Sequence, residues 1–233
     1  MIKLLTGGGL GDAAMSVGKL YSDDAPFDVD LNNMNLMHVE VGDSLLLAIN
    51  DFYKTQNINA TVKEISNWEE KEVIRNNYDY YLGTHWSNNN VGDESTWEIN
   101  PFPLLKFNKI TNVDTVVSIS GGRPDKFRGF TNDDIIELDN KYENVTFVGK
   151  SIDTFYDEYD FKNNNMVNKT DMQQLVDYIC SCNIFIGYAG FTMFLAAMAD
   201  KDVYGIRDSG DGWQYRVHPK WKVREISNIG DIK

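Results

Sequence analysis

The sequence predicts an α/β protein with two Rossmann-like lobes, each built on a parallel sheet. Short apolar runs alternate with amphipathic helical patterns, which is typical of β-α-β units. The alternation forms two separate series, divided from about residue 84 to residue 112 by an Asn-rich stretch that holds two prolines and shows neither pattern. We therefore expect an N-terminal lobe over residues 1–110 and a C-terminal lobe over residues 111–233, with their sheets facing each other across a cleft.

The first series opens with an apolar run at residues 2–5 and a glycine-rich turn at residues 6–12. Alanines, a valine and a leucine then recur at helical spacing over residues 13–20, so a helix is expected after the turn. A second helix is expected over residues 45–53, where the apolar residues lie on one face. The other elements expected in this lobe are a helix at 69–75 and strands at 36–41, 61–65 and 78–82.

The second series starts with a buried strand at residues 116–120, which ends in a pair of glycines. Thr131 or Asn132 is expected to cap a helix that runs to about residue 141. The remaining strands are expected at 145–148, 184–186 and 203–206, and the remaining helices at 171–180 and 191–198.

Charge and composition limit the functions that this chain can have. With 22 Lys and Arg against 35 Asp and Glu, the formal net charge is -13, which argues against a protein that holds nucleic acid on a broad basic face. No run approaches the roughly 18 apolar residues of a transmembrane helix, and the first residues do not resemble a signal peptide. A cytoplasmic location is therefore expected, the host cytoplasm if the source is viral. The spacing of Cys180 and Cys182 suits neither a zinc site nor a disulfide framework, so two buried thiols are expected.

The glycine turn of the first lobe leads into a helix N-terminus, where backbone N–H groups and the helix dipole favour a negatively charged ligand. Its glycines fit neither the dinucleotide-binding pattern G-x-G-x-x-G nor a Walker A loop. What remains is a Gly-x-Gly-Asp turn that ends at Asp12, at the carboxyl edge of the expected sheet. Two interpretations of Asp12 stay open: an N-cap that stabilises the helix by about 1 kcal/mol, and a general base that takes a proton from a hydroxyl group.

The most informative stretch of the second lobe is a strand that ends at Gly187, a turn of small residues and a helix that starts near Phe191. The N–H groups at such a helix start can bind a pyrophosphate group without a cationic side chain. Gly190, Phe191 and Thr192 are therefore candidate phosphate-binding residues. The alternative is a turn between a core strand and a core helix with nothing bound.

Three cations follow the first strand of the second lobe, although the protein as a whole is acidic: Arg123, Lys126 and Arg128. Together with Gly121 and Gly122, they form a second candidate phosphate site, because Lys and Arg bind phosphate oxygens through charge-assisted hydrogen bonds. The alternative is a solvated basic loop.

These patterns together resemble the glycosyltransferases of family 9, the heptosyltransferase type, which have the GT-B fold. The donor-binding turn of that family reads G-N-D-S-G-P-M-H-L-A-A-A, and five residues coincide with it without gaps: Gly187, Met193, Leu195, Ala196 and Ala197. Gly11-Asp12 is similar to the Gly-Asp of the family's first turn, and the segment at 120–128 is similar to its glycine turn followed by Lys or Arg, Arg and Trp. Where the family has Asp and His in the donor loop, this chain has Ala189 and Phe194.

The resemblance implies transfer of a sugar from a nucleotide-sugar donor to a hydroxyl acceptor, without a metal or any other cofactor. Asp12 would be the base, and the donor phosphates would lie against Gly121, Gly122, Arg123, Lys126, Arg128, Gly190, Phe191 and Thr192. A base opposite the leaving nucleotide favours direct displacement with inversion. The chain also lacks an Asp-x-Asp beside a strand end, the pattern of metal-dependent glycosyltransferases.

The candidate acceptor-binding residues lie in the N-terminal lobe. They are Gly9, Gly11, His85 and Trp86, of which the last two follow an expected strand and suit a sugar ring, although aromatic residues in loops also serve packing. The acceptor is either an envelope saccharide, as in the resembling family, or a hydroxymethylated base of DNA, as in bacteriophage GT-B glycosyltransferases. Two other functions stay open: a nucleotide-sugar-binding protein without catalysis, and a sugar-nucleotide epimerase-like enzyme.

Overall fold

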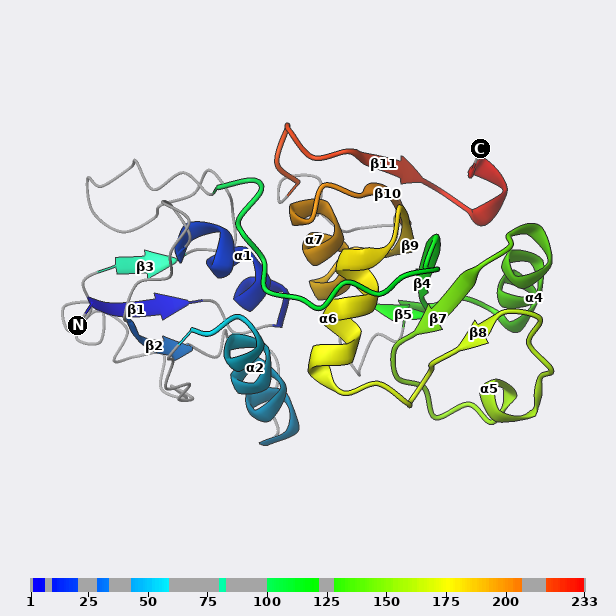
Figure 1. Ribbon diagram of the computed structural model, residues 1–233, viewed down its shortest axis with the longest axis horizontal. Helices are drawn as coiled ribbons and strands as arrows, with labels where there is room; N and C mark the ends of the chain where they lie inside the picture. The colour runs from blue at the N-terminus through cyan, green and yellow to red at the C-terminus, as the bar shows by residue number, and fades with distance from the viewer. Residues whose placement is uncertain are drawn as a thin grey trace. The chain divides into compact units, whose positions relative to one another are not determined.

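The computed structural model describes residues 2–6, 10–20, 29–33, 43–58, 80–82, 100–121, 128–206 and 217–232 (Figure 1). The chain divides into two compact units. The first comprises Met1–Lys106 and Tyr215–Lys220, and the second comprises Phe107–Gln214 and Trp221–Lys233. None of the helices in these ranges has the length and apolar character that crossing a membrane requires.

The described residues of the first unit include a parallel sheet of three strands in the order β2-β1-β3 (Figure 1). The central strand β1 (Ile2–Thr6) pairs with β2 (Val29–Asn33) on one side and with β3 (Tyr80–Leu82) on the other. The strands expected at 2–5 and 78–82 are therefore confirmed, and β2 is an addition. The strands expected at 36–41 and 61–65 and the helix at 69–75 lie outside the described residues.

In the described part of the first unit, the helices are α1 (Leu10–Leu20) and α2 (Asp43–Thr55), and both were expected. Ala13, Ala14 and Val17 of α1 are fully buried, as the helical spacing of these apolar residues predicts. A buried hydrogen bond of 2.8 Å between the hydroxyl groups of Ser16 and Tyr53 joins the two helices.

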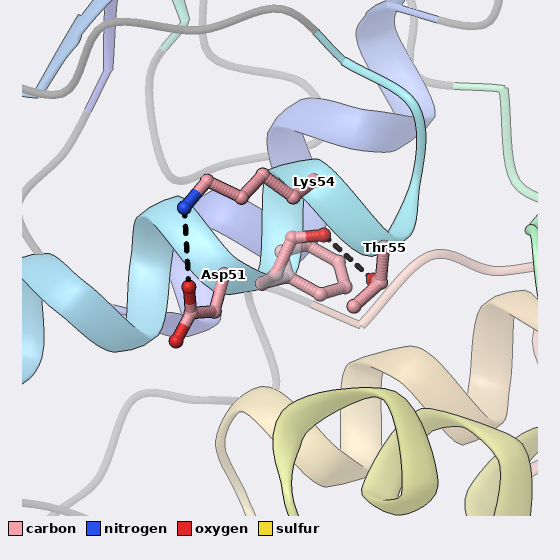
Figure 2. A network of polar contacts seen from close by, with 4 residues as sticks. Asp51, Lys54 and Thr55 are labelled. Carbon is pink, nitrogen blue, oxygen red and sulfur yellow. Dashed lines mark hydrogen bonds and ion pairs between the residues drawn. The ribbon is translucent and has the colours of Figure 1, made fainter.

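Polar side chains at the C-terminal end of α2 bond to the helix backbone and to each other (Figure 2). The Thr55 hydroxyl group donates to the carbonyl oxygen of Phe52 at 2.7 Å, which satisfies a carbonyl in the last turn of the helix. On the exposed face, Lys54 and Asp51 form an ion pair with a nitrogen-oxygen distance of 3.5 Å.

The second unit contains a six-stranded sheet in the order β11-β10-β9-β4-β7-β8, and all its neighbouring strands run parallel. Its strands are β4 (Thr115–Ser118), β7 (Val145–Val148), β8 (Asn164–Asn165), β9 (Ile184–Tyr188), β10 (Asp202–Ile206) and β11 (Val223–Ile226). From β4 the chain adds strands in one direction and then returns to add β9, β10 and β11 in the other direction. This is the doubly wound order, and its reversal between β4 and β9 is the place where such sheets bind ligands, at the carboxyl ends of the strands.

Helices cover both faces of this sheet (Figure 1). The helix α4 (Asn132–Lys141) packs Ile135 and Leu138 into a buried cluster with residues of β4 and β7, and α5 (Phe155–Glu158) adds Tyr156. On the other face α6 (Met172–Ser181) and α7 (Phe191–Met198) pack against each other, with α7 on β9 and β10. Crossovers in two opposite directions from β4 place helices on both faces. A short 3-10 helix, η3 (Ile229–Asp231), follows β11.

The helix starts expected in this unit agree with the structure. Thr131 caps α4 in a capping box with Asp134, and Asp171 caps α6 in a capping box with Gln174. In each box the cap side chain accepts from a backbone N–H group three residues later, which satisfies a donor that the helix leaves unpaired.

The connection between the units is held by side chains on each side. Residues 100–114 form no helix or strand, and the rest of the expected connector, from about residue 84 to residue 99, lies outside the described residues. The buried amide of Gln56 donates to the Lys106 carbonyl oxygen at 3.0 Å and accepts from the Lys106 N–H group at 2.9 Å, within the first unit. In the second unit the carboxylate of Asp177 accepts from the backbone N–H group and the side-chain amide of Asn108, at 2.7 and 3.0 Å.

Candidate functional site

The centre of the candidate site is the pair of strands at which the sheet order reverses. Ser118, the last residue of β4, is the register partner of Gly187 in β9. A Cβ atom at position 187 would lie 3.0 Å from two ring carbons of Phe185 and 3.2 Å from the Cβ atom of Ser118. Any larger residue at position 187 would require Phe185 or Ser118 to move. Glycine therefore allows the ends of β4 and β9 to lie close together.

The helix α7 begins directly beyond β9. Gly190 is its N-cap residue and has no side chain with which to accept from the N–H groups of the first turn. Among the described residues, no heavy atom lies within 4 Å of the position that a Cβ atom of Gly190 would take. The N-cap residue of α7 thus offers no side-chain acceptor to the N–H groups of the first turn, and the space in front of Gly190 is open. A helix start of this kind suits an anion.

A hydroxyl pair ties this helix start to the neighbouring strand. The Thr192 hydroxyl group donates to that of Ser118 at 3.1 Å, so the first turn of α7 is bonded to the carboxyl end of β4. The turn and helix expected around Gly190, Phe191 and Thr192 are confirmed as structure, and they lie at the reversal point of the sheet. Their phosphate-binding role stays a prediction.

A small hairpin follows β4 at the same edge. Its strands are β5 (Ser120–Gly121) and β6 (Arg128–Gly129), which pair antiparallel. The strand expected at 116–120 is therefore wrong in one respect: β4 ends at Ser118, because the Ile119 carbonyl oxygen accepts from the Phe130 N–H group at 3.3 Å and the chain turns into a separate sheet.

The hairpin brings two of the predicted donor-binding residues together. Gly121 and Arg128 are register partners across its two strands. Arg128 is thus part of a returning strand, whereas the sequence predicted a loop of cations after a single strand. The predicted donor-binding residues Gly122, Arg123 and Lys126 lie outside the described residues.

Tyr188, the last residue of β9, connects the sheet to the hairpin. Its hydroxyl group donates to the Gly129 carbonyl oxygen at 3.1 Å. Its ring packs edge-on against that of Phe130, with a distance of 5.4 Å between ring centroids.

The residues predicted in the first unit are only partly described. The helix α1 begins at Leu10, so Gly11 and Asp12 are its second and third residues. Asp12 lies inside the first turn and not at the N-cap position that one interpretation gave it. Gly9, His85 and Trp86 lie outside the described residues.

Two residues of the second-unit site were not singled out from the sequence. Ser118 belongs to no motif, and Tyr188 lies inside the donor-turn resemblance without coinciding with it; each is the last residue of its strand. The signal that could have found them is their position, because polar residues at the carboxyl ends of parallel strands line the ligand-binding edge of a doubly wound sheet.

The expected buried thiols are confirmed, since Cys180 and Cys182 are both fully buried and unbridged. Burial raises the pKa of the Cys182 thiol to about 12, and burial followed by the neighbouring Cys182 raises the pKa of Cys180 as well. Both thiols are therefore neutral at physiological pH and unsuited to nucleophilic or metal-binding roles. Among the described residues, no group of three or more His, Cys, Asp and Glu side chains could hold a metal ion.

No protein-family model matches the sequence, and no curated protein matches it significantly. Among solved structures, the chain is similar to a glycosyl transferase of family 9 from Veillonella parvula, with a TM-score of 0.57 and 10% identity over 97% of this chain and 85% of that chain. It is similar to the E. coli ADP-heptose LPS heptosyltransferase II, with a TM-score of 0.52 and 14% identity over 97% and 90% of the two chains. It is also similar to the E. coli heptosyltransferase WaaC with ADP-2-deoxy-2-fluoro heptose, with a TM-score of 0.56 and 10% identity over 97% and 92%. The chain therefore has the α/β fold of these glycosyltransferases.

Proposed function

We propose that this protein is a glycosyltransferase that uses a nucleotide-sugar donor. One observation carries the proposal: the segment from Gly187 to Thr192 lies at the reversal point of a doubly wound sheet, in a chain that shares the fold of heptosyltransferases. The same segment carries the sequence resemblance to the donor-binding turn of family 9. Fold, position and sequence thus favour one ligand, the nucleoside diphosphate part of the donor.

The chemistry required is stabilisation of a nucleoside diphosphate as it leaves the sugar. The first-turn N–H groups of α7, around Gly190, Phe191 and Thr192, would bind one phosphate group. The hairpin would supply the rest of the site through Gly121, Gly122, Arg123, Lys126 and Arg128. Cations at this position offset the charge of the leaving group without a metal ion.

Asp12 is the proposed general base, which would deprotonate the acceptor hydroxyl group for an inverting displacement. Its support is the family resemblance at Gly11-Asp12 and its place in the first turn of α1, just beyond the carboxyl end of β1. The acceptor would be bound by Gly9, Gly11, His85 and Trp86.

An envelope saccharide is the proposed acceptor. The net charge of -13 favours it over DNA, because a duplex must be held by cations against its phosphate charge. A hydroxymethylated base of phage DNA is the alternative. Transfer of labelled sugar to hydroxymethylated DNA, but not to lipopolysaccharide core acceptors, would show that DNA is the acceptor and would overturn the saccharide.

The first test is a thermal-shift panel of ADP, GDP, UDP and CMP compounds, with ADP first because an E. coli WaaC structure was determined with ADP. A ligand at 100 times its Kd should stabilise the protein by about 2.7 kcal/mol. Stabilisation by none of these compounds would overturn the proposed donor site.

The second test separates catalysis from binding. Asp12→Asn should retain nucleotide binding and lose transfer, while Asp133→Asn should retain both, since Asp133 is an exposed first-turn carboxylate of α4. Full transfer activity of Asp12→Asn would rule out Asp12 as the general base. Nucleotide binding without transfer by the wild-type protein to any acceptor would instead favour a nucleotide-sugar-binding protein.

A further inference from the structure

The hairpin of β5 and β6 is too short to hold its own position. It consists of two register pairs, Ser120 with Gly129 and Gly121 with Arg128. An isolated two-stranded hairpin is marginally stable at best, even when its strands are longer. The position of Arg128 must therefore be set by contacts between the hairpin and the rest of the second unit.

Besides the backbone hydrogen bonds of Ile119 with Phe130 and Val148, two side chains hold the described end of the hairpin. The first is the side chain of Phe130, which is buried in the cluster that also holds Ile119 and Ile186. The second is Tyr188, which reaches from the end of β9 to the Gly129 carbonyl oxygen. Phe130 fixes the chain after the hairpin, whereas the Tyr188 hydroxyl group holds the strand β6 itself, at the residue next to Arg128.

We propose that Tyr188 is a positioning residue for donor binding: by bonding Gly129 and packing on Phe130, it fixes the strand that carries Arg128 at the reversal point of the sheet. The donor part of this inference rests on the proposed function. Tyr188 makes no contact with substrate in this scheme and acts through β6.

The first experiment measures amide hydrogen exchange of the free protein and needs no ligand. Tyr188→Phe removes the hydroxyl group and keeps the ring that packs on Phe130. Exchange in peptides that cover residues 119–131 should become about fivefold faster, the effect expected for one lost hydrogen bond.

The matched control for this experiment is Tyr159→Phe. Tyr159→Phe also removes one hydroxyl hydrogen bond within the same unit, to the carboxylate of Asp139 at 3.2 Å, and that bond involves no residue of the hairpin. It should leave exchange over residues 119–131 unchanged. Unchanged exchange in Tyr188→Phe, or an equal increase in Tyr159→Phe, would overturn the positioning role and leave the proposed function intact.

The second experiment is a double-mutant cycle on nucleotide binding, measured by calorimetry with ADP, GDP, UDP and CDP. Tyr188→Phe should weaken the binding of the nucleotide that the wild-type protein prefers by about fivefold, and Tyr159→Phe should not weaken it. If Tyr188 acts through Arg128, the Tyr188→Phe effect should largely disappear in an Arg128→Gln background.

The outcomes are distinguishable. Full additivity of Tyr188→Phe and Arg128→Gln would overturn the proposed route through β6, whatever the exchange result. Failure of the wild-type protein to bind any of the four nucleotides would overturn the proposed function and the donor part of the inference, while hydrogen exchange would still decide whether Tyr188 fixes the hairpin.

Discussion

The hydroxyl groups of Ser118 and Thr192 lie 3.1 Å apart and join the carboxyl end of β4 to the first turn of α7. Ser118 is 1% exposed, so this bond forms at the inner end of the candidate anion site. The bond links the first turn of α7 to the end of β4, in addition to the packing of the buried α7 side chains on the sheet.

Thr192→Val should therefore reduce both stability and nucleotide binding. The change keeps the shape of the side chain and removes the hydroxyl group, at a cost of about 0.5 to 1.5 kcal/mol in the free energy of unfolding. Thr192→Ser keeps the hydroxyl group and should restore nucleotide affinity. Urea unfolding and calorimetric titration of both variants measure the two effects, and equal affinities of the two variants would contradict the role of the hydroxyl pair.

Gly187→Ala and Gly190→Ala should have opposite consequences. The first places a methyl group 3.0 Å from the Phe185 ring and should cost about 1 to 3 kcal/mol of stability through overpacking. The second has open space among the described residues and should cost less than about 1 kcal/mol, but its methyl group stands where the phosphate group is proposed to bind. Denaturant unfolding and nucleotide titration of the pair check this. An unchanged nucleotide affinity of Gly190→Ala would show that the phosphate group does not bind in front of Gly190.

Asp177→Ala should destabilise the protein by about 1 to 3 kcal/mol, because three donors from Asn108 and Gln173 lose a buried carboxylate acceptor. Asp51→Ala is the control, since the Asp51–Lys54 pair is exposed on both sides and should contribute less than about 0.5 kcal/mol (Figure 2). The free energies of unfolding in urea give the comparison. Equal losses in the two variants would show that the Asp177 bonds contribute little.

The buried thiols predict a loss of stability at alkaline pH. Their ordinary pKa is 9.0, and burial raises that of Cys182 to about 12. The unfolded chain therefore releases these protons at lower pH than the folded chain, so the stability that the thiols contribute is complete below pH 9.0 and is lost as the pH rises toward 12. The free energy of unfolding should fall less steeply over this range in Cys180→Ala/Cys182→Ala than in the wild-type protein. A thiol reagent at pH 8 should react only after denaturant is added.

Central strands were predicted better than edge strands. The strand at 145–148 and the helix at 191–198 were expected with the bounds that the structure has, since both segments are mostly apolar and buried, which gives a strong pattern. Of the strands at the edges of the two parallel sheets, as far as the structure describes them, β3 was expected, whereas β2, β8 and β11 were not. Edge strands can carry polar residues, as Asn164 and Asn165 of β8 do, so the apolar pattern does not reveal them.

The sequence predicted the parts of the candidate site that depend only on residues close together in the chain. The turn before Phe191 follows from small residues between a strand and a helix, and the structure has it there. Ser118 and Tyr188 could not be found in this way, because their positions beside Thr192 and Gly129 depend on which strands become neighbours. Which strands become neighbours is decided by the order of strands in the sheet, which no short segment of the sequence reveals.

The segment Tyr215–Lys220 belongs to the first unit although it follows nearly the whole second unit in the chain. This segment is synthesised after residues 107–214, so its contacts within the first unit can form only when most of the second unit has already been synthesised.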